Sequence, residues 1–436
     1  MRNYLLSLLV ALLAVTSSLP AAAQEAYAVL TSDETLTFYY DNQRTTRQNY
    51  ERIYDMPKPN QKPAWTGTYD NPQENIKHVV FDASFSGYRP TSTHKWFAYC
   101  VYLQDIVGIR NLNTEKVTNM SNMFGYCHTL KSLDVSNFNT QNVTNMGGMF
   151  SGCWALRSLD LSNFNTQNVT NMGEMFEGCW ALTSLDLSNF NTQNVTNMST
   201  MFRYCYALKS LDVSNFNTQN VTDMSDMFSD CSALTSLDLS NLNTQNVTNM
   251  SDMFSDCYAL TSLDLSNLNT QNVTNMGHMF YSCKALTSLN VSNFNTQNVI
   301  DMVSMFSGCS ALTSLDVSNF NTQNVIYMRD MFYGCESLTT IFCNNNWNVG
   351  HNVSGDHMFF GCRHLKGTNT SYDASKTGIE MANPTTGYFT SKTTGIDHVK
   401  TADQAGDGKI YDLSGRRVNE SYKGIVIKNG KKYIQK

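Results

Sequence analysis

Cysteine recurs every 26 residues through the middle of this 436-residue chain, and most of the residues around each cysteine recur with it. A fixed period of about 20 to 50 residues is typical of a linear stack in which each small unit buries its apolar face against its neighbours. We therefore expect the function to lie on a long repeated surface. The cysteines in register are Cys127, Cys153, Cys179, Cys205, Cys231, Cys257, Cys283, Cys309 and Cys335.

Each unit, taken here as residues 146–171, combines two periodicities. Apolar residues at i, i+3, i+4 and i+7 predict a short amphipathic helix: Met146, Met149, Phe150 and Cys153. The Leu-x-x-Leu-x-Leu motif that follows, from Leu156 to Leu161, predicts a half-buried strand. The same pattern places most of the methionines in the core, where packing explains them better than metal binding. The sequence thus predicts an α/β solenoid, a curved stack of strand-loop-short-helix units.

The N-terminus has the three zones of a secretory signal peptide: Arg2, an apolar run from Leu5 to Val15, and small residues from Ala21 to Ala23. We therefore expect a secreted or outer-surface protein, and no segment long and apolar enough for a direct membrane span. Twelve cysteines in an exported chain would suggest disulfides. One cysteine per helix would separate neighbouring Cα atoms by roughly 10 Å, beyond the ~7 Å limit for a disulfide, so buried free thiols are predicted.

The repeat resembles that of the BspA-like leucine-rich-repeat surface proteins of bacteria. The motif is Asn-x-Asn-Thr-x-x-Val-Thr-Asn-Met-x-x-Met-Phe-x-x-Cys-x-x-Leu-x-x-Leu-Asp-Val/Leu-Ser, as in residues 137–162. The resemblance implies a leucine-rich-repeat-like stack on a secreted or cell-surface protein that binds host matrix proteins or other cells. The usual leucine-rich-repeat asparagine is displaced, since Asn163 follows Leu161 by two residues instead of three.

The C-terminal tail resembles the small β-rich sorting domain of secreted Bacteroidetes proteins, and Asn429-Gly430 is a strong hairpin signal within it. An inert β module that ends the chain is the alternative. The expected segments are a signal peptide (1–24), an N-terminal β-rich entry or capping region (25–95), the 26-residue repeat solenoid (96–365), a C-terminal cap and linker (366–395) and the small β sorting-like domain (396–436).

The residue after each repeat cysteine varies and is mostly aromatic in the first half of the array. Aromatic rings one unit apart would form a stripe that stacks on sugar rings or anchors a protein partner. The alternative is that they shield the helix ends and the methionine core. The candidate binding residues are Trp154, Trp180, Tyr206 and Tyr258.

Three further patterns bear on metal binding and catalysis. An outward column of aspartates, from Asp134 to Asp316, is either a calcium ladder or a solvated surface, and too few oxygens flank it for calcium. His351, His357, His364 and Cys362 lack the spacing of a zinc site. No nucleophile with a partner base and no phosphate-binding loop is present, so we expect no enzyme, metal or cofactor.

The net charge of -6, without a block of lysine or arginine in the repeats, argues against nucleic acid as a partner. Residues and resemblance together predict an adhesin-like binding protein whose extended surface recognises a host extracellular-matrix protein, a partner cell surface or a glycan. A structural spacer or surface coat without a specific ligand is the alternative, because each added unit adds one more equivalent interface.

Overall fold

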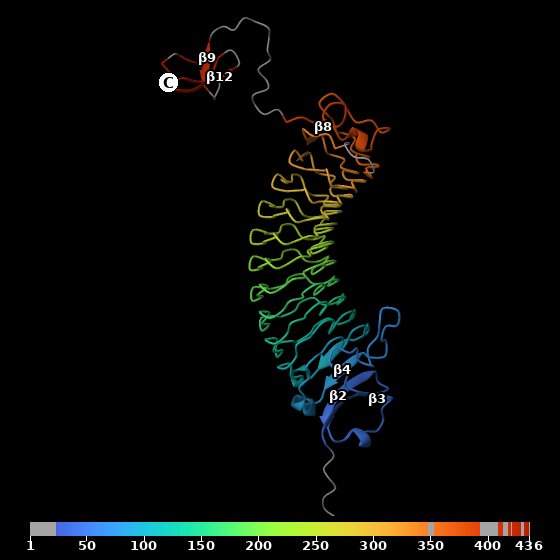
Figure 1. Cartoon of the computed structure of the whole chain (residues 1–436). Coiled ribbons are helices and arrows are strands. Elements are labelled where there is room, and N and C mark those ends of the chain that lie inside the picture. The colour runs from blue at the N-terminus through green and yellow to red at the C-terminus, as the bar shows by residue number, and fades with distance from the viewer. Residues whose placement is uncertain are drawn as a thin grey trace, which may run out of the picture. The chain divides into compact units, whose positions relative to one another are not determined.

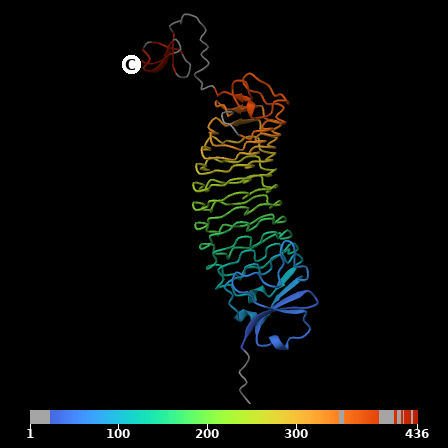
Figure 2. The same ribbon diagram turned by 45° about the vertical axis from the view of Figure 1, so that its right-hand side comes forward.

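The computed structural model describes residues 23–347, 353–392, 409–412, 417–419, 421–428 and 431–435. The chain divides into two compact units, one that ends at Thr390 and one that begins at Ser391. In the first unit, successive repeats form coils stacked along one gently bowed axis (Figures 1 and 2). The repeats therefore build a solenoid-like stack. Most of the expected signal peptide lies outside the described residues.

A five-stranded sheet of order β3-β1-β2-β4-β5 covers the N-terminal end of the stack. β1 and β2 form an antiparallel hairpin in which Leu30 pairs with Leu36, whereas β2, β4 and β5 run parallel. The elements are β1 (Glu25–Leu30), β2 (Thr35–Asp41), η1 (Arg44–Thr46), β3 (Arg52–Asp55), β4 (His78–Phe81), η2 (Ala83–Gly87), β5 (Asp105–Val107) and η3 (Ile109–Asn111). Phe38 of β2 stacks on Trp96 of the first coil at 5.7 Å, so the sheet seals the end of the core.

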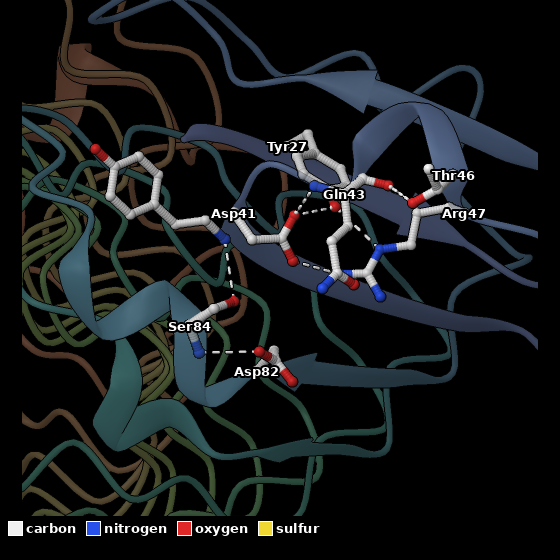
Figure 3. Close-up of polar contacts among 8 residues, drawn as sticks. Tyr27, Asp41, Gln43, Thr46, Arg47, Asp82 and Ser84 are labelled. Carbon is white, nitrogen blue, oxygen red and sulfur yellow. Dashed lines mark hydrogen bonds and ion pairs between the residues drawn. The ribbon is translucent and has the colours of Figure 1, made fainter. Parts of the chain in front are cut away.

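A polar cluster ties the chain after η1 to the β1–β2 hairpin (Figure 3). The Tyr27 hydroxyl donates to Asp41 at 2.6 Å and accepts from Arg47 Nε at 2.9 Å. Arg47 also donates to Asp41 at 2.5 Å. Burial and the bond to Asp41 raise the pKa of Tyr27 to about 12, so the phenol stays protonated as a donor. These bonds hold the hairpin and the following chain together, so the cluster is a structural part of the cap.

The coils are joined by a regular backbone pattern in which every second N–H bonds to the next coil. In the unit that begins at Met146, the N–H groups of Met146, Gly148, Phe150 and Gly152 donate to carbonyls of the following coil at 2.7 to 3.0 Å. The N–H groups of Met149, Ser151 and Cys153 bond three residues back, and that of Gly147 donates to Asn145 Oδ1 at 2.9 Å. Gly148 and Gly152 have left-handed φ values of 63° and 68°. The segment is thus a chain of overlapping turns, two of them with the left-handed third residue of a type II turn.

The predicted helix over residues 146–153 is wrong in its backbone, although its four apolar residues are all fully buried. A right-handed helix cannot contain two left-handed residues four apart, and it would bond its N–H groups within itself instead of to the next coil. No α-helix occurs in any part of the chain that the structure describes. Stacked turns bury residues at i, i+3, i+4 and i+7 just as a helix does, so this spacing alone could not distinguish the two backbones.

The predicted strand at the Leu-x-x-Leu-x-Leu motif forms a hydrogen-bonded ladder only near the ends of the stack. There β6 (Ser314–Asp316), β7 (Thr340–Phe342) and β8 (Phe389–Thr390) form a parallel sheet. In the central coils, among the described residues, the only β pairing is one parallel bridge per coil, as at Asn145 with Asn171. In the central coils, the backbones of neighbouring coils are therefore joined along the Met-Phe-Cys segment.

Asparagine and threonine side chains make a second set of bonds between coils. Asn163 Nδ2 donates to the Phe138 carbonyl of the preceding coil at 2.8 Å. The Thr140 hydroxyl donates to the Asn165 carbonyl at 3.0 Å and accepts from the Asn165 N–H at 2.7 Å. Because these bonds recur from coil to coil, the displaced asparagine of the repeat acts by binding backbone carbonyls one coil back.

All twelve cysteines are free and buried, as predicted, but the reason given for it is wrong. Backbones joined directly by hydrogen bonds lie about 4.8 Å apart, far closer than neighbouring helices. Each repeat Sγ lies against a backbone carbonyl; Cys153 Sγ, for example, lies 3.2 Å from the Phe124 oxygen. Methionines and phenylalanines fill the rest of the core, with Phe150 and Phe176 stacked at 5.8 Å.

The C-terminal end of the first unit is closed around Trp347, which packs on Phe389 with ring centroids 4.9 Å apart. The short helix η4 (Ile379–Met381) precedes Phe389 in the chain. The second unit holds a four-stranded antiparallel sheet of β9 (Ile410–Asp412), β10 (Arg417–Val418), β11 (Gly424–Lys428) and β12 (Lys431–Gln435). Lys428 pairs with Lys431, as a hairpin between β11 and β12 requires. Asn429 and Gly430 lie outside the described residues.

The left-handed positions make a stability prediction at Thr200, whose φ is 55°. A β-branched residue is strained there, whereas Asn122 adopts a φ of 52° at the equivalent place. Thr200→Asn should therefore raise the free energy of unfolding by about 1 kcal/mol. Thr222→Asn, at a threonine outside the left-handed positions, is the control and should bring no gain. Equal urea midpoints for the parent and Thr200→Asn would contradict the strain argument.

Candidate functional site: an aromatic column and an adjacent groove

The residues after the repeat cysteines stand above one another because each coil repeats the backbone of the last. His128 and Trp154 stack at 3.4 Å with planes 4° apart, and Trp154 and Trp180 stack at 4.3 Å with planes 3° apart. Tyr206 continues the row at 5.9 Å with a tilt of 48°. We call these four residues the aromatic column.

The aromatic column presents ring edges, since the rings cover one another's faces. Trp154 is half-buried between two neighbours, and Trp180 and Tyr206 are 40% and 39% exposed. A surface that stacks on sugar rings needs aromatic faces that are open to solvent. Parallel rings at van der Waals distance cover each other's faces and leave few of them open. The structure brings Trp154, Trp180 and Tyr206 together, but it gives the first two a packing role that their spacing alone did not distinguish.

Tyr258 lies two coils beyond Tyr206 and has different neighbours. Its ring is 41% exposed and lies under Lys284 Nζ at 4.4 Å. A hydrogen bond to Asp256 and, to a lesser degree, burial raise the pKa of Tyr258 to about 12. The tyrosine thus joins a cation to a carboxylate at the border of a groove.

The groove has a volume of about 770 Å³ and crosses the coils of the second half of the stack. It combines carboxylates, guanidinium groups, imidazoles, hydroxyls and three tyrosines. Its lining residues are Arg203, Tyr204, Ser229, Asp230, Asp252, Ser255, Asp256, His278, Tyr281, Ser304, Ser307, Arg329, Asp330, Tyr333 and His357.

Most acidic and aromatic side chains of the groove come from the two left-handed positions of each coil. Asp252 and His278 have φ values of 56° at the first position, and Tyr204 and Asp256 have 61° and 57° at the second. Glycine fills the same two positions at Gly148 and Gly152, which do not line the groove. In the sequence these two positions alternate irregularly between glycine and larger residues, as at Glu174 and Gly334, so the pattern has a meaning only once the turns are known.

Two ion pairs neutralise part of the charge in the groove. Arg203 lies 3.4 Å from Asp226, and Arg329 lies 2.9 Å from Asp330. Burial, reinforced by the neighbouring Asp226 and opposed by His278, raises the pKa of Asp252 to about 6. Burial and Asp256 also raise the pKa of Asp230. Burial is thus the main cause of both shifts, and the nearby Arg203 offsets it only in part.

The aspartate column predicted from the sequence lies on a different part of the coils. Asp160 and Asp238 are exposed, and each accepts a hydrogen bond from a backbone N–H two residues on, at 3.0 and 2.9 Å. The bonds from Ser240 lower the pKa of Asp238. These interactions are those of a solvated surface with local turns.

The metal candidates do not converge in the described part of the chain. No group of three or more histidine, cysteine, aspartate or glutamate side chains there has the arrangement of a metal site. His357 lies 3.8 Å from Asp330, His364 is exposed, and Cys362 is buried in the core. His351 lies outside the described residues. Within those residues, no helix is long and apolar enough to cross a membrane.

Three overlapping segments of the chain, residues 91–185, 174–288 and 258–372, match one family of repeat proteins. This family is described as "Mycoplasma protein of unknown function, DUF285", and the chain belongs to it, because the match covers more than half of the sequence. No curated protein matches the sequence. Among solved structures, the crystal structure of a TLR13-ssRNA13 complex is similar at 18% identity and a TM-score of 0.25, over 67% of this chain and 46% of that one. The chain thus spans less than half of that protein's chain.

The aromatic column makes a stability prediction. Trp154→Ala removes two stacked contacts, each worth about 0.5 to 1.5 kcal/mol beyond the area buried, and should lower the free energy of unfolding by about 1 to 3 kcal/mol. Tyr258→Ala, whose ring lies outside the stack, should cost less than half as much. Urea unfolding of both variants checks this. If both cost the same, the column is not a packing element.

The groove makes a prediction about pH. A raised carboxyl pKa stabilises the folded state below the ordinary value of 3.8, and this contribution is lost as the pH rises through about 6. Asp252→Asn does not titrate, so its melting temperature relative to the parent should increase from pH 4 to pH 7. Hydrogen bonds from Ser266 lower the pKa of Asp264, so Asp264→Asn should change little relative to the parent from pH 4 to pH 7 and should gain on the parent only as the pH falls below about 3.8. A pH-independent difference for Asp252→Asn would refute the assignment.

Proposed function

We propose that this chain is an exported, surface-associated binding protein of the BspA-like kind, which recognises a macromolecular partner through the groove. The partner classes are a host matrix protein, another cell surface or a glycan. The observation that carries this proposal is the groove itself, in which tyrosine, histidine, arginine and aspartate converge over several coils of an otherwise uniform stack. Solenoid proteins commonly bind their partners on extended surfaces that run across several repeats.

Backbone geometry supports a role in binding. Left-handed φ values cost free energy in residues other than glycine, and strained positions of this kind often mark functional sites. Asp226, Asp252 and His278 occupy such positions on three successive coils, with φ values of 55°, 56° and 56°. Glycine would build the same turns without the cost, and the side chains of Asp252 and His278 at these positions line the groove.

Export rests on the N-terminal segment and on the tail that resembles a sorting domain. A chain that lacks residues 396–436 tests the second of these. Retention of that chain on the cell surface at the parent's level would show that the tail is an inert β module.

The binding proposal is tested with the purified full chain on an array of matrix proteins and glycans and on whole cells. We expect at least one ligand to bind with a dissociation constant in the micromolar range or below. Tyr281→Ala with Asp256→Asn should weaken that binding, and Asp186→Asn with Asp212→Asn on the exposed column should not.

A spacer or coat without a specific ligand is the second candidate. The near-identical stretches Asn241–Asn249 and Asn267–Asn275 favour it, because uniform coils adjust length without changing a site. Absence of binding to every array member, with normal surface assembly after deletion of one coil, would favour the spacer over the binding protein.

A further inference from the structure

We propose that the groove binds an extended polypeptide segment of a protein partner that carries lysine or arginine side chains. This inference rests on the proposed function and names the chemistry of the partner. Three observations support it: the length of the groove, the tyrosines that line it, and the contacts that the chain's own lysine and arginine make with tyrosine rings beside it.

The groove's own cations are already engaged. Arg203 pairs with Asp226 and Arg329 pairs with Asp330. Among the described residues, no lysine or arginine lies within ion-pair distance of the three other carboxylates that line the groove: Asp230, Asp252 and Asp256. A ligand therefore meets excess negative charge at this end of the groove.

The contacts that these carboxylates do make leave their charge in place. The hydroxyls of Ser229 and Ser255 donate to Asp230 and Asp256 at 3.3 and 3.2 Å. His278 Nδ1 lies 4.0 Å from Asp252. Neutral hydroxyls solvate a carboxylate without cancelling its charge, whereas a ligand ammonium or guanidinium group would cancel it and form stronger, charge-assisted bonds.

Two cations of the chain itself show which ligand group this surface suits. Arg203 lies over the Tyr204 ring with its guanidinium carbon 4.5 Å from the centroid. Lys284 Nζ lies 4.4 Å over Tyr258, whose hydroxyl bonds to Asp256. Each pairs a cation with a tyrosine face beside a carboxylate, and the ring's negative face attracts the cation. Tyr281 lines the groove near Asp252 and Asp256 without a lysine or arginine over its ring in the described residues, and so offers the same contact to a ligand.

The length of the groove fits an extended segment. Its lining residues run from Arg203 to His357, about six coil spacings of ~4.8 Å each, or roughly 29 Å. An extended chain advances about 3.3 Å per residue, so the groove accommodates roughly nine residues. The basic side chains of the segment belong at the end that lies over Asp230, Asp252 and Asp256.

The test uses the full chain and a fluorescent nonapeptide of alternating glycine and lysine, with a second peptide in which glutamine replaces each lysine. Asp230→Asn with Asp256→Asn removes two groove charges, and asparagine is tolerated at left-handed positions, as Asn122 shows. The matched control is Asp238→Asn with Asp264→Asn, which removes the same charge from the exposed column of the same two coils.

We expect the lysine peptide to bind the parent, the groove variant to bind it at least tenfold more weakly, and the control variant to bind within twofold of the parent. The glutamine peptide should bind at least tenfold more weakly than the lysine peptide. Equal losses in the groove and control variants would overturn the inference, because they would reduce the binding to general attraction by a negative surface. Equal binding of the two peptides would overturn it as well.

This inference and the proposed function fail in different ways. If the full chain binds a matrix protein or glycan on the array but not the lysine peptide, the binding function stands and the cationic segment is wrong. If a neutral glycan binds and the groove variant loses it, the groove takes sugars instead. Thermal unfolding of each variant shows that a loss of binding does not come from a loss of fold.

Discussion

The structure depends on one backbone arrangement, the donation of every second N–H of the Met-Phe-Cys segment to the next coil. The remaining N–H groups close turns within the coil, and left-handed residues at two places allow both sets of bonds to form. This satisfies buried backbone groups that would otherwise cost free energy. It also fixes the coils in register, so that every column of side chains, from the phenylalanine core to the groove, follows from the same bonds.

The sequence predicted the burial of the repeat well and its backbone poorly. Met146, Met149, Phe150 and Cys153 are buried as the spacing required, because an i, i+3, i+4, i+7 pattern marks one inward face. The pattern does not say whether that face belongs to a helix or to stacked turns. Gly148 and Gly152, four residues apart, were the informative residues, since a helix of this length rarely contains two glycines. The β11–β12 hairpin was predictable because its signal is local.

The candidate site shows the same division. Alignment of Trp154 and Trp180 on successive coils follows from the 26-residue period, but the period does not reveal that the rings face each other at 4.3 Å. The groove was not predicted at all, because its residues are spread over seven coils and come together only through the left-handed turns. The net charge describes the whole protein. It does not reveal that three carboxylates without a lysine or arginine partner lie together in the groove.

The column of buried thiols has a consequence for how the protein withstands an oxidising medium. Burial raises the pKa of Cys153, as it does for the other repeat cysteines, and keeps the thiolate, which is the reactive form, from appearing. When coils open, neighbouring sulfurs become accessible together at a spacing that permits cross-linking between coils that are not meant to be joined. In an oxidising medium such a protein is protected from oxidation only while it is folded, so the lifetime of its reduced form is set by the rate at which the stack opens.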